Sequence, residues 1–344
     1  MKLSFKSLIE ETIKGESSWN YYSAQLPVSI DDFDSCREFI KSFILAGGKE
    51  SVLVSKIDKL DNFRVQHICS LFFIGIYIYK NSSKINVAID KSMKRFPEKK
   101  FKSRIEFSYI WFLLCLFHDL GYKEETNPTI GYSSFDDFKR DNKLSSLGSI
   151  SGVPKFYKSV YEQYFNNRIY NENKIDHGIY ASFFLYHDLK KHRAEKEKLI
   201  NENWNNNPNL CYEKKLDLVY NYSAWIILAH NIWFTNTSEK ALTERYNQAG
   251  LGELVLKENE YKIALQKHPF LFLFCLVDTI EPIKRIKEFS LFDKITLDLS
   301  NVNELIIESH LSCGCHDAVL NQVNSLGKWL IKAELYNNRV KINL

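Results

Sequence analysis

The chain has 344 residues, of which 45% are hydrophobic, and it can bury the core of one large domain or two ordinary ones. Its 46 basic and 42 acidic residues nearly balance, which argues against strong non-specific nucleic-acid binding but leaves a local basic groove open. The amino terminus is charged too often for a secretion signal, and the apolar runs are too short to span a bilayer. We therefore expect a globular, cytoplasmic protein.

The seven cysteines follow no regular spacing, and several lie inside apolar runs, where free thiols behave as small core side chains. Reduced thiols fit a reducing compartment. Cys313, Cys315 and His316 are clustered, but a second matching pair of ligands is missing. We interpret this cluster as a loop of reduced cysteines rather than a metal site.

The apolar patterns up to about residue 290 are too long for strands and predict an all-helical region. The expected helices cover residues 33–47, 62–81, 103–121, 177–203, 216–233 and 268–289. The segment 122–170 is rich in Gly, Ser, Pro, Asn and Asp, so we expect an inserted long loop followed by one helix. A long loop in a compact domain is usually functional or disordered.

The pattern changes after residue 290. Residues 294–299 and 303–309 have strand composition, 318–331 has helical spacing, and the last residues of 333–344 alternate. The prediction is a mainly α fold, with a helical domain over 1–290 and a small α/β appendage over 291–344. The role of this appendage is open between dimerisation, substrate choice and packing alone.

His118 and Asp119 follow an apolar run, and Gly121 just beyond them predicts that a buried helix ends there. Burying two polar groups is costly unless they find partners. Adjacent side chains on a helix point about 100° apart, so the pair can share one target only if other helices supply further ligands. A metal ion meets that description.

The His-Asp dipeptide occurs twice more, and its context separates the three copies. His187 and Asp188 lie where a helix becomes rich in lysine, so we interpret them as surface residues. His316 and the aspartate after it belong to the Cys-Gly-Cys segment. Only the first pair ends a helix that is apolar nearly all round.

Other predicted helices carry single polar groups in similar apolar settings: His67, His177, His230 and Asp278. A lone histidine on an apolar face is more often a hydrogen-bonded core residue than a ligand. Asp278 is a stronger signal, because a carboxylate is rarely buried without a partner or a metal. Pro282 four residues later removes a helix hydrogen bond and bends or ends the helix. Five helices could thus bring one ligand position each to a common centre.

The candidate ligands, taken in chain order, resemble those of the HD superfamily of metal-dependent phosphohydrolases, specifically its two-metal branch. They are His67, His118 with Asp119, His177, His230 and Asp278. The resemblance covers about residues 60–285 and implies an HD-type helical bundle. It implies that His67, His118, Asp119 and Asp278 bind one ion, and that Asp119 bridges to a second ion held by His177 and His230. The ions would be divalent Fe, Mn, Co, Ni or Zn. A bridging hydroxide would attack the phosphate, with Asp119 in a catalytic role.

Two details narrow the resemblance. Cyclic-di-GMP phosphodiesterases of the HD-GYP type have a lysine in HDxGK, whereas here that position is Tyr122, Lys123 comes one later, and the GYP signature is missing. This disfavours a cyclic-di-GMP substrate. The segments "DHGIYAS" and "DTIEP" are similar to bacterial HD hydrolases that act on nucleotides, including those that split dinucleoside polyphosphates.

A phosphate substrate needs positive charge beyond the ions, which arginine can supply with a bidentate fork. The expected substrate-binding residues are Arg64, Lys123, Asn231, Lys284 and Arg285. Lys123 is also placed among the catalytic residues because it could reach a substrate phosphate, and Asn231 could orient a water or a phosphate oxygen. For each, a solvated surface position is the alternative. The many tyrosines and phenylalanines could form a stacking wall for a base, although most must be core.

The sequence therefore predicts a metal-dependent hydrolase of a phosphoester or phosphoanhydride bond, most plausibly in a nucleotide or dinucleotide. The enzymatic alternative is a single-strand nuclease, which a continuous basic groove would favour. The alternative of another class is a catalytically silent, nucleotide-sensing binding protein. The expected partner is a small phosphorylated substrate rather than nucleic acid or a membrane, and a homo-oligomer is possible.

Overall fold

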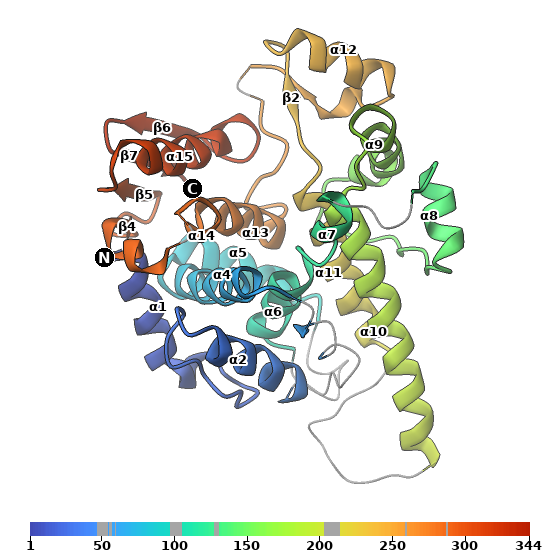
Figure 1. Cartoon of the computed structure of the whole chain (residues 1–344), viewed down its shortest axis with the longest axis horizontal. Coiled ribbons are helices and arrows are strands. Elements are labelled where there is room, and N and C mark those ends of the chain that lie inside the picture. Colours follow the sequence, from blue (N-terminus) through green and yellow to red (C-terminus); the bar gives the residue numbers. More distant parts are fainter. Residues whose placement is uncertain are drawn as a thin grey trace.

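A computed structural model describes residues 1–46, 54, 57, 58, 60–96, 105–126, 131–202, 214–258, 260–286 and 288–344. The chain is mainly helical, with a small antiparallel sheet at one side of the helical core (Figure 1). This is the fold class that the sequence predicts. No helix within the described ranges has the length and apolar character of a membrane span.

The described α-helices are α1 (Phe5–Lys14), α2 (Phe33–Ala46), α4 (Asn62–Asn81), α5 (Ser83–Met93), α6 (Phe107–Phe117), α7 (Tyr122–Thr126), α8 (Phe135–Asp141), α9 (Tyr157–Glu172), α10 (His177–Glu202), α11 (Leu216–His230), α12 (Lys240–Gln248), α13 (Pro269–Ile280), α14 (Ile283–Ile286) and α15 (Cys313–Ser325). Short 3-10 turns cover Glu16–Ser18, Gly252–Leu254, Phe289–Lys294 and Leu326–Lys328. Each of the six predicted helical segments contains a helix.

Helices α4, α6, α11 and α13 form the centre of the molecule, and each packs against at least two of the others. Every residue of α6 is buried, as is every residue of α4 from 65 to 78. Helices that are apolar all round are stable only when other elements cover every face. Helices α1 and α2 cover α4, and α10 lies along α11 (Figure 1).

Close approach of α4 to α6 depends on Gly75. The Trp111 ring lies where a side chain at this position would be, 2.0 Å from an added Cβ. The indole N–H of Trp111 donates to the carbonyl of Phe72 at 3.1 Å, which fixes the ring in place. The ring therefore cannot move aside cheaply.

We predict that Gly75→Ala lowers the free energy of unfolding by about 1–3 kcal/mol, because it overpacks a rigid part of the core. Chemical denaturation of both proteins measures the change. Gly314→Ala is the control, since nothing lies within 4 Å of its added Cβ, and it should leave stability equal or slightly higher. Equal stabilities for wild type and Gly75→Ala would contradict the packing described here.

The sheet joins the two ends of the chain. Its strands are β1 (Lys2–Ser4), β4 (Ile295–Asp298), β5 (Glu304–Ser309), β6 (Ala333–Tyr336) and β7 (Arg339–Asn343). Their order is β1-β4-β5-β7-β6, and every neighbouring pair is antiparallel. Leu297, Ile307 and Val340 lie in register and are fully buried, and α15 packs on this sheet. The strands and the helix predicted after residue 290 are thus confirmed.

Four details differ from the expectations. Residues 1–290 are not all helical, because β1 pairs with β4 and a two-stranded parallel sheet joins β2 (Thr235–Asn236) to β3 (Val255–Leu256). The insertion 122–170 is not a loop with one helix, since it holds α7, α8 and α9. The Ser134 hydroxyl caps the start of α8. The polar composition of the segment made this helix look like a loop in the sequence. Cys313 begins α15, so the cysteine cluster is not a loop.

Candidate metal centre

His118 and Asp119 lie where α6 ends, one turn before α7 begins. His118 caps α6, and its Nδ1 donates to the Cys115 carbonyl at 2.9 Å. Both side chains are buried, with 0% and 5% of their residues' surface exposed. Because the chain turns sharply here, both side chains face the same space, as the sequence predicted.

Four predicted ligands converge on that space from α4, α6 and α13. The Nε2 atoms of His67 and His118 are 3.2 Å apart. Asp278 Oδ1 lies 3.4 Å from the first of these nitrogens and 3.5 Å from the second. Asp119 Oδ1 is 3.4 Å from His118 Nε2, and its Oδ2 is 3.8 Å from His67 Nε2. His67, His118 and Asp119 form a buried group that could hold a metal ion.

The distances from His118 Nε2 to His67 and to Asp119 suit a common ion. Two ligand atoms about 2.1 Å from one ion and about 90–110° apart lie roughly 3.0–3.4 Å from each other. Because each ring donates its Nδ1 hydrogen elsewhere, the neutral rings point Nε2 lone pairs at each other. Such lone pairs repel unless a proton or a cation lies between them. A proton can bridge only two of these ligand atoms, whereas a metal ion can bind His67, His118 and Asp119 together.

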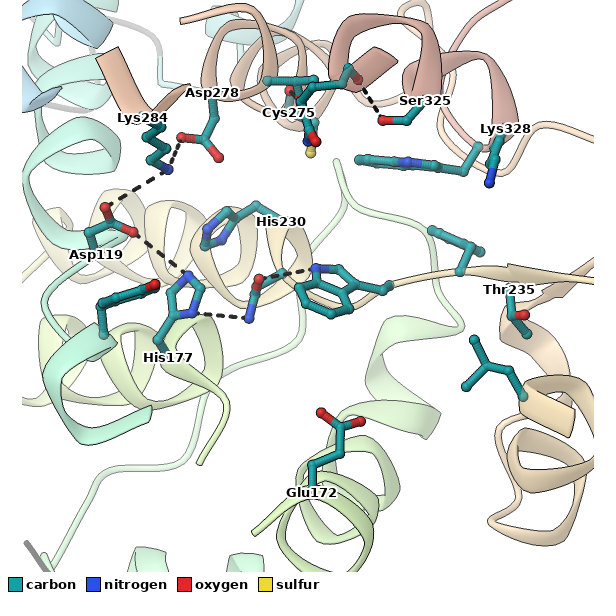
Figure 2. Close-up of a pocket in the computed structure, with 18 of the residues that line it drawn as sticks. Asp119, Glu172, His177, His230, Thr235, Cys275, Asp278, Lys284, Ser325 and Lys328 are labelled. Carbon is teal, nitrogen blue, oxygen red and sulfur yellow. Dashed lines mark hydrogen bonds and ion pairs between the residues drawn. The ribbon is translucent and has the colours of Figure 1, made fainter. Parts of the chain in front are cut away.

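The remaining two predicted ligands, His177 and His230, lie near the same centre. His177 Nε2 is 3.7 Å from Asp119 Oδ1. Figure 2 marks this contact with a dashed line. The ring of His230 stands beside those of His177 and His118, with centroids 5.5 and 5.6 Å away. His230 Nδ1 donates to the carbonyl of Ile227, which leaves its Nε2 free for a ligand. Asp119 thus contacts His67, His118 and His177, and His230 lies beside the last two.

Gly178 allows α10 to begin against the end of α11. A Cβ at this position would lie 2.9 Å from the Ile227 carbonyl oxygen and 3.1 Å from His230 Cε1. The carboxylate of Asp176 caps the helix by accepting from the Ile179 backbone N–H at 2.8 Å. His177 therefore starts a helix within reach of His230.

Two buried glutamates that the sequence analysis missed support the histidines. Glu281 accepts from His67 Nδ1 at 2.9 Å and also from the Ser70 hydroxyl. Glu125 accepts from His177 Nδ1 and pairs with Arg168. A carboxylate behind a histidine fixes the tautomer and raises the basicity of the other nitrogen, an arrangement common around bound metals.

Positive side chains balance the two aspartates. Arg64 pairs with Asp119, and Lys284 Nζ lies 2.6 Å from Asp278 and 3.9 Å from Asp119 (Figure 2). Burial alone would raise the pKa of both carboxyls, but His118, Lys284 and Arg64 hold the pKa of Asp119 well below its usual range. Lys284 and His118 do the same for the pKa of Asp278. Both groups are therefore ionised, as metal ligands must be.

The four histidines differ in the direction in which their surroundings shift the pKa. Burial lowers the pKa of His118, and burial with the neighbouring His177 and His118 lowers the pKa of His230 to about 3. These two rings are neutral at pH 7, the form that binds metals. Burial also opposes the charged forms of His67 and His177, but their neighbouring carboxylates outweigh it and raise the pKa of each.

Asp119 borders two cavities, one of about 970 Å³ and one of about 650 Å³. The larger is lined by Asp119, His177, His230, Asp278 and Lys284 at one end, and reaches the carboxy-terminal segment at the other (Figure 2). Arg64 lines both cavities. The candidate metal centre is therefore accessible to a small ligand.

The predicted substrate-binding residues fall into different positions. Arg64 and Lys284 contact the aspartates of the centre. Asn231 lines the larger cavity but is buried, with both ends of its amide bonded to protein groups. Lys123 is exposed and lines only the smaller cavity. Arg285 is half-buried and lines neither of these cavities.

The other His-Asp pairs lie apart from this centre. His187 and Asp188 are half-buried on α10, so they are less exposed than the surface position predicted. Cys315 is a half-buried free thiol on α15. Among the described residues, the group of His67, His118 and Asp119 is the one whose ligand atoms come close enough together for a metal ion.

Comparisons of the chain with protein-family models, curated proteins and solved structures found no match. The likeness to HD phosphohydrolases therefore stays an expectation from the order of the candidate ligands in the sequence.

Glu281→Gln tests the support of His67. The variant keeps the size of the side chain but removes its charge, and loss of such a partner costs about 10- to 100-fold in metal affinity. We expect that weakening in a competition titration against a chelator. Glu288→Gln, an exposed glutamate seven residues later, should bind metal as the wild type does. An unchanged affinity for Glu281→Gln would mean that His67 is not a ligand.

Proposed function

We propose that this chain is a metal-dependent phosphohydrolase of the HD type that hydrolyses a phosphoester or phosphoanhydride bond in a nucleotide. The observation that carries the proposal is the convergence of six ligand-type side chains from distant parts of the chain. His67 and His118 lie 3.2 Å apart and 3.4–3.8 Å from Asp119 and Asp278, and His177 lies 3.7 Å from the shared Asp119. Such convergence in an apolar core is costly unless it serves a cation.

His67, His118, Asp119 and Asp278 would hold one ion, and Asp119, His177 and His230 a second. Divalent transition metals would supply Lewis acidity toward a phosphoryl oxygen and acidify a bound water. Metal identity follows availability, since imidazole and carboxylate suit Fe, Mn, Co, Ni and Zn.

The protein groups around the ligands have separate tasks in this proposal. Arg64 stacks on Tyr122, with its guanidinium carbon 3.8 Å from the ring centroid, so its fork is held at the border of both cavities. Lys284 adds a second positive charge beside Asp278. Both can bind phosphate oxygens when a metal ion takes over the charge of the aspartates.

The far wall of the larger cavity favours a small substrate over a nucleic-acid strand. Arg245 lies 3.3 Å from Glu172, and Lys328 lies 3.7 Å from Glu239, so acidic groups offset the basic ones. A nucleic-acid groove neutralises many phosphates with unopposed lysine and arginine.

Asp119→Ala is the direct test, and Asp188→Ala is its matched control because it changes the aspartate of the second His-Asp pair. Mutation of even a supporting residue of a metal site lowers metal affinity or activity about 10- to 100-fold. Loss of the shared aspartate should therefore lower turnover more than about 100-fold. Elemental analysis should show fewer ions per chain for Asp119→Ala, while Asp188→Ala keeps both metal and activity. Circular dichroism verifies that both variants fold.

The substrate screen uses manganese-supplemented protein with nucleoside mono-, di- and triphosphates, cyclic and dinucleotides, dinucleoside polyphosphates, and single-stranded DNA and RNA. We expect the protein to hydrolyse at least one small nucleotide. Cleavage of single strands alone would favour the nuclease, and ligand binding without turnover would favour a sensor. Metal and hydrolysis retained by Asp119→Ala would contradict the site itself.

A further inference from the structure

An indole lies exposed in the wall of the larger cavity, three residues after His230. Trp233 is 54% exposed, whereas Trp19, Trp111 and Trp225 are each at most 3% exposed. A large apolar side chain that stays in contact with solvent beside a polar centre suggests a ligand-binding surface.

The indole of Trp233 is held in a fixed orientation. Its ring N–H donates to Asn231 Oδ1 at 3.1 Å, and its backbone N–H donates to the Tyr164 hydroxyl at 3.3 Å. The guanidinium of the buried Arg168 lies 4.9 Å from the ring centroid. With Arg168 against it on the protein side, the ring is rigid and ready to receive a ligand.

Asn231 connects this indole to the metal centre. Its amide nitrogen donates to Asp176 at 2.7 Å and lies 3.2 Å from His177 Nδ1. The same amide therefore holds Trp233 through its oxygen and contacts His177 through its nitrogen. The distance between the indole and the predicted phosphate site is set by hydrogen bonds rather than by a flexible loop.

The carboxy-terminal segment completes the cavity. Trp329 stacks on Phe234 with centroids 5.9 Å apart and an angle of 18°, and both line the wall. Figure 2 shows Ser325 and Lys328 across the hollow from His177. A volume of about 970 Å³ is near the top of the range of roughly 300–1,000 Å³ typical of small-molecule sites.

We propose that Trp233 is the platform on which the base of a nucleotide stacks while its phosphate lies beside Asp119, His177 and His230. The phosphate position rests on the function proposed above. Stacking of a base on an aromatic side chain contributes about 1–3 kcal/mol and tolerates any base, because every base has a π face. Trp233 is thus a specificity residue that selects nucleotides over phosphates without a base.

Calorimetry on the full-length protein with its bound metal tests this, with adenosine monophosphate and ribose 5-phosphate as probes. Trp233→Ala should weaken binding of adenosine monophosphate about 5- to 150-fold, from the stacking energy at 1.4 kcal/mol per tenfold. The affinity for ribose 5-phosphate should fall much less. Trp233→Phe should recover most of the affinity for adenosine monophosphate. Tyr170→Ala is the control, because this 75%-exposed tyrosine on α9 lines neither cavity.

Equal losses for both probes, unchanged binding of adenosine monophosphate to Trp233→Ala, or no binding of it to wild type would each overturn the base platform. Phosphorus NMR of the same samples, extended to the substrate screen, separates the two proposals. Nucleotide binding that depends on Trp233 without hydrolysis of any phosphate bond supports the platform and overturns the hydrolase. Hydrolysis with nucleotide binding that does not depend on Trp233 supports the hydrolase and overturns the platform.

Discussion

The structure depends on one electrostatic constraint: two imidazoles lie 3.2 Å apart in the apolar centre of a helical protein, and each lies 3.4–3.8 Å from two carboxylates. Groups of this kind repel one another when they are deprotonated and dry, so positive charge has to lie among them. Lys284 and Arg64 balance the two carboxylates, and His67, His118 and Asp119 lie close enough together to hold a metal ion. The same residues are thus costly for folding and useful for binding.

The helical core makes this cluster rigid. Ligands come from the ends of α6 and α13, from the first residue of α10, from the last residue of α11 and from the interior of α4. Because α4, α6, α11 and α13 pack directly on one another, a shift of His67, His230 or Asp278 has to move the core. Buried glutamates behind His67 and His177 fix the rings further, so the candidate ligands are held in place by the protein itself.

The sequence predicted structure correctly where residues adjacent in the chain determine a residue's environment. The apolar run before His118 predicted a buried helix, and Pro282 predicted the end of α13, which stops at Ile280. Glu281 and Glu125 were missed because their partners lie 214 and 52 residues away, and a glutamate in sequence resembles any surface glutamate. Strand β1 was missed because three residues carry too little periodicity, and β4 alone decides its pairing. The segment that holds α8 was taken for a loop because its polar composition resembles that of a loop.

The measurement that tests the central claim most directly is anomalous diffraction from a crystal of the metal-loaded protein, recorded at the absorption edge of the metal found by elemental analysis. The account predicts one peak about 2.0–2.2 Å from Nε2 of both His67 and His118, and a second beside His177 and His230 with Asp119 between them. Density for water or a lysine nitrogen at that position, with no anomalous peak under saturating metal, would contradict it. The histidines would then be core residues held by hydrogen bonds.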